Sequence, residues 1–398
     1  MQLHYTIPDL LDMGCANENV PALHHWGSSG WETLSYRELR TATEELALGF
    51  KAQTCLYSEN AHGSIQIGLL LKNDMYWAMA DVGSLLAGWV TVPIAADQSI
   101  ETIRWIINDA NLHALVVSDR KALERLHGCI EQIKLIVVLG ESSPSDWFDM
   151  QSNGRMITTL RHLRSQGRCH YSPEVVTALK KEIHPEDLAT IVYTADASGL
   201  VKGVRLSHKN LTGNIWAAFN SMPGLVPGAP EVALSFLPLN HIFARTFLYG
   251  HFGFGHDIYF STPSRVWRHL ATVQPTIFIT VPRFLEKVYE RIDSLRQQST
   301  GLRHVWLSWC WHWAHRYQSE YRYLPWHRLQ CWLLRHGVFR NLYQAFGGNI
   351  RYLLCGGAAL RPEVMTFFNA VGIPVKQGYG LTETSSVLSY TRDRWLRE

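Results

Sequence analysis

Residues 193–204 combine small side chains, glycines and one lysine in a way that suits phosphate binding. The stretch reads Tyr-Thr-Ala-Asp-Ala-Ser-Gly-Leu-Val-Lys-Gly-Val, follows an apolar run and precedes Ser207–Asn210, where we expect a helix to begin. Small residues let backbone N–H groups approach a phosphate, a hydroxyl can donate a hydrogen bond, and Lys202 supplies a positive charge. Because neither Ser nor Thr follows the lysine, the stretch is not a Walker A sequence. Taken alone, we interpret it as a tight turn.

Three further stretches place polar groups or glycines directly after apolar runs. They are Leu237–Arg245, Cys355–Leu360 and Gln377–Thr384. In open α/β sheets, ligands bind at such positions, beyond the carboxyl ends of the strands. Each stretch has an ordinary alternative, with His241 as a core histidine, Gly356-Gly357 as a turn and Glu383 as a solvated acid. Their order and spacing along the chain favour a common site.

Short apolar runs recur along the chain and do not alternate with polar residues. Strands buried on both faces of a parallel sheet have this pattern, so we predict strands there. Helix-length segments such as 210–219 and 282–295 separate the runs, which indicates βαβ units and an α/β fold. Ser35 and Glu38 form a capping-box pattern, which predicts a helix through Phe50. The predicted strands are 114–117, 135–138, 188–193, 232–236, 277–281 and 350–354.

We expect two α/β subdomains, residues 1–185 and 186–398. The polar stretch 141–185 is interpreted as a surface excursion or as a joint between the subdomains. The stretch 221–231, with three prolines and two glycines, is interpreted as a loop. The longest uncharged apolar stretch, 82–96, is too short to span a bilayer and predicts a buried helix that runs into a strand.

The composition is that of an ordinary globular protein. Of the 398 residues, 46% are hydrophobic and 18% are charged, and the net charge is +3. This balance excludes disorder as the main state and gives no reason to expect a nucleic-acid partner. The start of the chain lacks the basic and apolar regions of a signal peptide. Seven scattered cysteines without a CxxC pair indicate a reducing compartment, so we expect a cytoplasmic protein without a zinc site.

Residues 295–345 differ in composition from the rest of the chain. They hold seven arginines, six tryptophans, four tyrosines and a single acid, Glu320. We favour a pair of helices with aromatic residues in the core and arginines that extend into solvent. The alternative is an interfacial helix pair on an anionic membrane, since Trp, Tyr and Arg favour the headgroup region. That alternative would place the protein at the inner membrane face.

In combination, these motifs resemble the large N-terminal domain of the AMP-forming adenylating enzymes. This superfamily contains acyl-CoA synthetases, luciferases and peptide-synthetase adenylation domains, and the chain is most similar to long-chain fatty acyl-CoA synthetases. The resemblance implies stacked, mostly parallel sheets with flanking helices, and it covers nearly the whole chain. The segment 295–345 lies where those enzymes carry a helical insertion. The residues that carry the resemblance are Pro238 with His241, the run Val281–Tyr289 and the run Tyr379–Ser385.

The resemblance implies a ligase that activates a long-chain fatty acid in two steps. The fatty carboxylate attacks the α-phosphate of ATP to give acyl-AMP and pyrophosphate, and coenzyme A then displaces AMP to form a thioester. ATP, Mg²⁺, a fatty acid and coenzyme A are therefore the expected ligands. The implied catalytic residues are His241 beside the carboxylate, Thr382 at a phosphate and Glu383 as the Mg²⁺ ligand. The implied phosphate-binding residues are Thr194, Ser198, Gly199, Lys202 and Gly203; Gly357 and Ala358 would border adenine and the acyl chain, and Tyr379 would stack on adenine.

The phosphate stretch departs from the family pattern Tyr-Thr-Ser-Gly-Thr-Thr-Gly-x-Pro-Lys-Gly. Ala195, Asp196, Ala197 and Val201 replace Ser, Gly, Thr and Pro. Two hydroxyl donors are lost, each worth roughly 1.5–3 kcal/mol when bonded to a charged group. Asp196 also adds a carboxylate where a triphosphate should lie. We therefore predict weakened ATP binding.

The sequence ends at Glu398, soon after the Thr-Glu motif, whereas the family continues into a small mobile C-terminal domain that carries a lysine for adenylation. We expect that domain to be absent here or to be a separate chain. One hypothesis is a fatty-acid ligase impaired by these departures. The other is a catalytically degenerate protein, or gene remnant, that binds an acyl group or a nucleotide. A membrane-surface module that uses 295–345 is a weaker third hypothesis.

Overall fold

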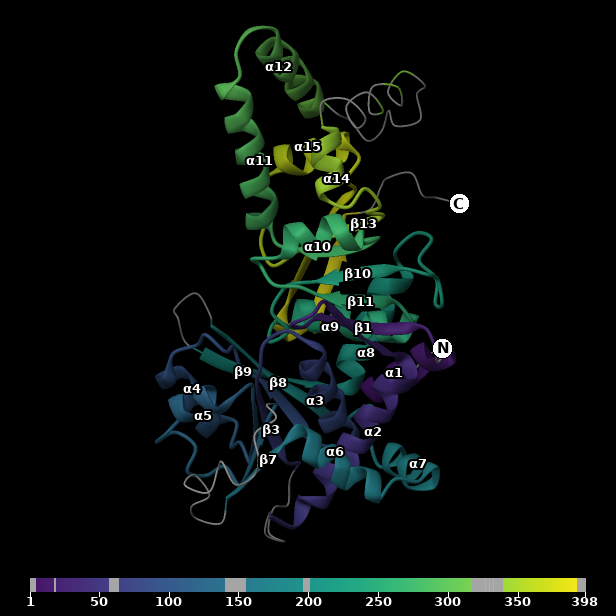
Figure 1. Cartoon of the computed structure of the whole chain (residues 1–398), viewed down its shortest axis with the longest axis vertical. Coiled ribbons are helices and arrows are strands. Elements are labelled where there is room, and N and C mark those ends of the chain that lie inside the picture. The colour runs from purple at the N-terminus through teal and green to yellow at the C-terminus, as the bar shows by residue number, and fades with distance from the viewer. Residues whose placement is uncertain are drawn as a thin grey trace.

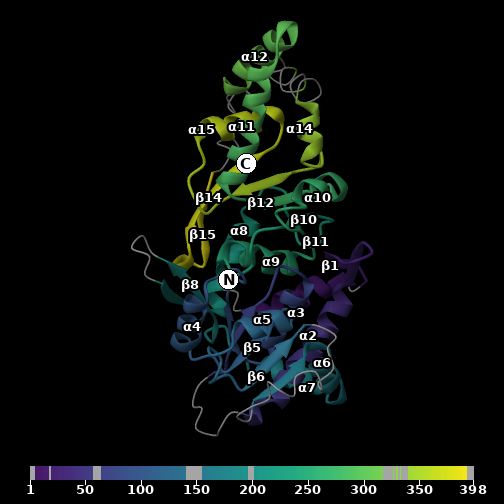
Figure 2. The same cartoon turned by 60° about the vertical axis from the view of Figure 1, so that its left-hand side comes forward.

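Two mostly parallel β-sheets with helices between and outside them make up the molecule (Figures 1 and 2). The computed structural model describes residues 5–17, 19–56, 64–139, 155–195, 201–316, 326, 329, 332 and 339–391. The predicted α/β fold is confirmed, and all six predicted strands are present within two residues of their expected positions. Their apolar residues are buried on both faces, as the absence of alternation required.

The first sheet has seven strands in the order β7-β6-β5-β3-β4-β8-β9. All neighbours pair in parallel except β8 and β9, which are antiparallel. Helices α4 (Ile100–Asp109) and α5 (Arg120–Arg125) pack on one face of this sheet. The strands are β3 (Gln66–Leu70), β4 (Val90–Pro93), β5 (Ala114–Val117), β6 (Leu135–Val138), β7 (Met156–Thr159), β8 (Leu188–Ala195) and β9 (Val201–Ser207).

The second sheet has eight strands in the order β15-β14-β13-β12-β10-β11-β1-β2. The two outermost strands, β15 and β2, are antiparallel to their neighbours, and the other pairs are parallel. The strands are β1 (Pro21–Trp26), β2 (Trp31–Ser35), β10 (Val232–Ser235), β11 (Asp257–Phe260), β12 (Ile277–Thr280), β13 (Tyr352–Cys355), β14 (Val375–Leu381) and β15 (Ser386–Tyr390).

Helices between the sheets join them into one core. A single apolar cluster contains residues of both sheets together with residues of these helices. The predicted capping box at the start of one of them is present, because the Glu38 carboxylate accepts from the Ser35 N–H at 2.8 Å and Ser35 Oγ accepts from the Glu38 N–H. The helices of this layer are α1 (Ile7–Gly14), α2 (Tyr36–Ala52), α3 (Met75–Leu86), α8 (His208–Asn220) and α9 (Ile242–Phe254).

Sheet membership does not follow the expected division at residue 185. Strands β1 and β2 come from the first part of the chain but belong to the second sheet, whereas β8 and β9 come from the second part and complete the first sheet. The interpretation of 141–185 as a surface excursion is also wrong for its described part. That part supplies an edge strand, β7, and two helices, α6 (Leu160–Cys169) and α7 (Pro173–Lys181).

The remaining helices flank the second sheet and extend from it. They are α10 (Val266–Val273), α11 (Pro282–Gln298), α12 (Gly301–His315), α14 (Arg340–Ala345) and α15 (Pro362–Val371). Helices α11 and α12 form a hairpin at the end of the molecule farthest from the seven-stranded sheet (Figures 1 and 2). Within the described residues, no helix combines the length and the hydropathy needed to cross a membrane.

Candidate functional site

A pocket of about 500 Å³ lies beyond the carboxyl ends of three strands of the second sheet. Leu237 follows β10, Val281 follows β12 and Gly357 follows β13, and all three line it. The hairpin of β14 and β15 forms a further wall, and Thr194 of β8 reaches the pocket from the first sheet. The pocket therefore lies where both sheets meet, at the strand ends that the sequence indicated.

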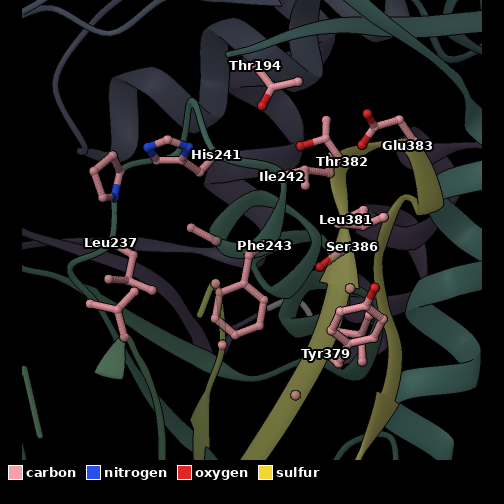
Figure 3. Close-up of a pocket in the computed structure, with 18 residues that line it drawn as sticks. Thr194, Leu237, His241, Ile242, Phe243, Tyr379, Leu381, Thr382, Glu383 and Ser386 are labelled. Carbon is pink, nitrogen blue, oxygen red and sulfur yellow. The ribbon is translucent and has the colours of Figure 1, made fainter. Parts of the chain in front are cut away.

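Four polar side chains of the predicted site lie close together in the pocket. Figure 3 shows Thr194, His241, Thr382 and Glu383 gathered at one end, and the rings of Phe243 and Tyr379 away from them. The Tyr379 side chain is exposed, so a ring face is open to a ligand. Such a pocket can hold an anion at its polar end and an apolar or aromatic group at the other.

His241 is held at the polar end by the loop that precedes helix α9. It is the residue just before the helix, and its N–H donates to the Pro238 carbonyl at 3.1 Å. Asn73 fixes the same loop, since its side-chain N–H₂ donates to the Leu237 carbonyl and its oxygen accepts from the Leu239 N–H at 2.9 Å. Partial desolvation by the surrounding atoms lowers the pKa of His241, and Asp97 opposes that shift. The imidazole is therefore neutral at pH 7.

Helix α9 is anchored to the first sheet through a buried ionic network. Arg245 and Asp81 of α3 are both fully buried and form an ion pair. Arg245 also donates to Thr190 of β8 at 2.6 Å and to Thr91 of β4, and Tyr249 donates to Asp81. Because buried charges need such partners, this network fixes the helix that begins beside His241.

The turn that carries Thr382 and Glu383 is a short 3₁₀ helix, η5 (Thr382–Thr384), between β14 and β15. Thr384 Oγ1 accepts from the Leu381 N–H at 3.0 Å and closes the turn. Asn214 of α8 braces the hairpin from outside, because its side chain donates to the Val387 carbonyl at 2.7 Å and accepts from the Val387 N–H at 3.3 Å. Both site residues are thus placed by contacts with a distant helix.

Glycine is required at one position near the pocket where two backbones approach closely. A Cβ on Gly380 would lie 1.5 Å from the Ser386 carbonyl oxygen across the hairpin. A Cβ on Gly356 would lie 3.0 Å from the Phe243 ring. Gly380 is therefore required for a steric reason, independently of any ligand, whereas a Cβ at position 356 would require only a small shift of the Phe243 ring.

Glu383 forms an ion pair with Lys202 of β9 across the polar end of the pocket. The distance from Lys202 Nζ to Glu383 Oε1 is 2.9 Å, and each side chain is about half exposed. The hydrogen bond from Lys202 holds the pKa of Glu383 below its usual range, so the carboxylate is ionised at neutral pH. The pair brings together the cation predicted for a phosphate and the carboxylate predicted for a metal ion.

The structure brings most of the predicted site residues to one place. The pocket is lined by Thr194, His241, Gly357, Tyr379, Thr382 and Glu383. Lys202 is not among the lining residues, but it forms an ion pair with Glu383. Ala358 follows Gly357 but is not among the lining residues. Gly203 sits opposite Tyr193 in the β8–β9 ladder, where a Cβ would lie 2.9 Å from Ile191 Cγ2. Ser198 and Gly199, like Asp196 and Ala197, lie outside the described residues.

Sequence reasoning did not identify Asn73 or Asn214 as residues that position the site. Asn73 acts on a loop 164 residues away, and Asn214 on a hairpin 173 residues away. The sequence contains only weak indications of these two roles. Asn73 follows a buried strand, and Asn214 lies inside a predicted helix although asparagine is a poor helix former.

The chain is similar in sequence to a known protein family and to several curated proteins. The sequence profile of the family described as "AMP-binding enzyme" matches residues 15–398. Peroxisomal long chain acyl-CoA synthetase 6 of Arabidopsis thaliana is 30% identical over 351 residues, which cover 85% of this chain and 47% of the relative. A long-chain-fatty-acid–CoA ligase of Mycobacterium bovis is 28% identical over 374 residues, which cover 89% of this chain and 56% of the relative. The chain spans about half the length of these curated relatives.

Solved structures show the same fold at low sequence identity. The adenylation domain of a carboxylate reductase from Mycobacterium chelonae matches with a TM-score of 0.72 and 20% identity, over 97% of this chain and 59% of that one. A long-chain-fatty-acid–CoA ligase from Archaeoglobus fulgidus matches with a TM-score of 0.68 and 15% identity, over 98% of this chain and 67% of that one.

Proposed function

Because this chain belongs to the family of AMP-binding enzymes, we propose that its pocket binds ATP and a long-chain fatty acid and joins them as an acyl-adenylate. The observation that carries the proposal is the pocket itself, in which the charged and hydroxyl groups at one end adjoin apolar walls. Fatty acids combine the same two properties, and relatives at about 30% identity are named long-chain acyl-CoA synthetases and ligases.

The first step needs charge stabilisation more than proton transfer. A carboxylate oxygen attacks the α-phosphorus of ATP, the bond to the oxygen that bridges to the β-phosphorus breaks, and pyrophosphate leaves with its electron pair. No proton moves in this step. Lys202, Thr194 and Thr382 would hold phosphate oxygens, and the neutral His241 ring would orient the fatty carboxylate through an N–H without adding a second charge.

The donor set at the polar end fits a Mg²⁺ ion that arrives with ATP. Mg²⁺ prefers oxygen ligands and is commonly held by one or two carboxylates together with substrate phosphates. Glu383 is ionised and half exposed, and the Thr382 hydroxyl is next to it in the turn. These two residues would hold the ion, and its charge would help to neutralise the triphosphate.

Thioester formation is the second part of the proposal. The thiolate of coenzyme A would attack the acyl carbonyl carbon, and AMP would leave as the carbon–oxygen bond of the mixed anhydride breaks.

A cytoplasmic location also stays a prediction from the composition.

The second candidate function is ligand binding without catalysis. It is favoured by the phosphate stretch, in which Ala195, Asp196 and Ala197 replace residues that would donate to or approach a triphosphate. In that case the chain would bind an acyl group or a nucleotide and would not form the adenylate.

ATP–pyrophosphate exchange by the purified chain separates the two candidates. We expect exchange that requires both palmitate and Mg²⁺. We also expect Glu383→Gln to lower the exchange rate at least about tenfold, since it removes a charge that acts at the reacting phosphates. The matched control is Glu124→Gln, which breaks a similarly exposed ion pair with Arg120 on helix α5 and should change little.

Absence of exchange in a folded chain would contradict the proposed catalysis. If that chain still binds palmitate or ATP in equilibrium dialysis, the second candidate is the correct one. Exchange without dependence on palmitate would show adenylation of some other acid, and the fatty-acid part of the proposal would fail.

A further inference from the structure

Helix α12 carries an apolar stripe that is open to solvent. Leu302, Val305, Trp306 and Trp309 are 89%, 64%, 55% and 48% exposed. Their spacing of three, one and three residues places them on one side of the helix. Among the other described residues, Trp326, Leu329 and Trp332 are also exposed and stand close together in the sequence, whereas the remaining exposed large apolar side chains are distributed over several elements. The stripe on α12 is therefore a local concentration.

The stripe is not the face with which α12 packs on the protein. Cys310 and Ala314 are buried, and the Trp311 ring lies 4.8 Å from the Tyr289 ring of α11 and 5.0 Å from the Phe367 ring of α15. The helix therefore has one apolar face in the protein core and a second apolar face outside. A helix that is apolar on both sides normally has an apolar or interfacial environment on both.

The tryptophans of the outer face form an ordered row that continues to the partly buried Trp313. The rings of Trp306 and Trp309 are stacked at 5.3 Å, and those of Trp309 and Trp313 at 5.2 Å. Tryptophan combines a large apolar body with one N–H donor, which suits the headgroup region of a bilayer. Because the rings are already packed together, little conformational entropy is lost when they enter that region.

The charge around the stripe distinguishes between its possible occupants. Residues 282–316, which form the α11–α12 hairpin and its end, contain six basic residues and three acids, a net charge of +3. Arg296 is paired with Asp293 at 2.6 Å, and Arg316 is exposed. Two copies that met through this face would bring like charges together. An anionic lipid surface would instead attract them.

The position of α12 permits contact with an extended surface. Both views place the α11–α12 hairpin at the end of the molecule farthest from the seven-stranded sheet (Figures 1 and 2). Helix α11 begins directly after Val281, which lines the pocket, and its 17 residues span about 25 Å. A bilayer that contacts α12 would therefore lie away from the ATP-side residues.

We propose that the outer face of α12 docks on an anionic lipid bilayer, with Leu302, Val305, Trp306 and Trp309 in the headgroup region. The exposed Arg316 at the end of α12 contacts lipid phosphate. This docking does not depend on the proposed ligase activity, and the two are tested separately.

Co-sedimentation with vesicles tests the docking. We expect the chain to bind vesicles of equal phosphatidylcholine and phosphatidylglycerol at least about tenfold more tightly than phosphatidylcholine alone, because arginines near the surface respond to anionic lipid. The double variant Leu302→Gln/Trp306→Gln should lower binding to the mixed vesicles by more than about tenfold, since two large apolar contacts are lost. Both positions are exposed, so the fold is retained.

The matched control places glutamine at one aliphatic residue and one tryptophan that are exposed elsewhere. Val226→Gln/Trp105→Gln alters a loop and helix α4, and it should leave vesicle binding within about twofold of the parent. Equal binding of the parent and the α12 variant would overturn the proposal. So would a dimer that the α12 substitutions dissociate while vesicle binding stays absent, because the face would then join two copies.

A measurement on the unaltered chain gives an independent test. Brominated phosphatidylcholine in the mixed vesicles should quench tryptophan fluorescence, since the α12 rings would enter the headgroup region. Vesicle binding without quenching would mean a contact through another surface and would overturn the proposal.

Discussion

At the scale of single residues, the Lys202–Glu383 pair is the most informative contact of the site. Its partners are half exposed, and exposed pairs of this kind are typically worth about 0.2–1 kcal/mol. A ligand that brings both phosphates and a cation can exchange this weak pair for two stronger contacts. The ion pair therefore keeps both charged groups at the site, and breaking it for a ligand costs little free energy.

The phosphate stretch gives the prediction at this scale. Replacing Ala195→Ser, Asp196→Gly and Ala197→Thr together should lower the Kd for Mg-ATP at least about tenfold, as measured by isothermal titration calorimetry. Two hydroxyl donors to a charged group return, each worth roughly 1.5–3 kcal/mol, and one repelling carboxylate is removed.

Adding Lys202→Met to the triple variant is the control for this prediction. The gain in affinity should largely disappear, because the added donors and the Lys202 charge are expected to act on the same phosphates. An unchanged Kd in the triple variant would show that the stretch does not limit ATP binding.

At the scale of elements, the sequence predicted what local chemistry determines. Apolar runs marked the buried strands, and the Ser35–Glu38 pair marked the start of α2. Strand β9 was not predicted, because glycine and charged residues interrupt its pattern and its outer side is exposed. The location of the site could be predicted from the polar residues and glycines that follow the predicted strands. The hydrogen bonds by which Asn73 and Asn214 hold the site could not, because they join residues that are far apart in the sequence.

Gly380→Ala is the prediction at this scale. Because the new Cβ would meet the Ser386 carbonyl oxygen, the hairpin must shift, and we expect the free energy of unfolding to fall by about 1–3 kcal/mol. The displaced η5 turn should also weaken Mg-ATP binding. Urea unfolding followed by circular dichroism measures the first effect, and calorimetry the second.

Gly378→Ala on the same strand is the matched control. Its new Cβ would have only ordinary contacts at 3.9 and 4.0 Å, with the Cys355 and Ser389 carbonyl oxygens. We expect its unfolding free energy to stay within about 0.5 kcal/mol of the parent. Equal stability of the two variants would contradict the close approach at Gly380.

At the scale of the whole molecule, each of the two sheets contains strands from both the first and the second part of the chain. The first part supplies β1 and β2 to the second sheet, and β8 and β9 return to the first sheet. The Arg245 network lies where these parts meet, because it joins α9 to α3, β4 and β8. The pocket needs Thr194 from one sheet and His241 from the other side of this junction, so the junction sets its geometry.

Double-mutant cycles on Arg245 and Asp81 test this role. Asp81→Asn or Arg245→Met alone leaves a buried charge without its partner and should lower the free energy of unfolding by about 3–5 kcal/mol. The double variant buries no unpaired charge, so its loss should be smaller than the sum of the single losses by about 2 kcal/mol or more. The same cycle on the exposed Arg120–Glu124 pair should give a coupling below about 1 kcal/mol. If the Arg245–Asp81 losses simply add, the ion pair is not what joins α9 to the first sheet, and the position of His241 must depend on the surrounding apolar contacts instead.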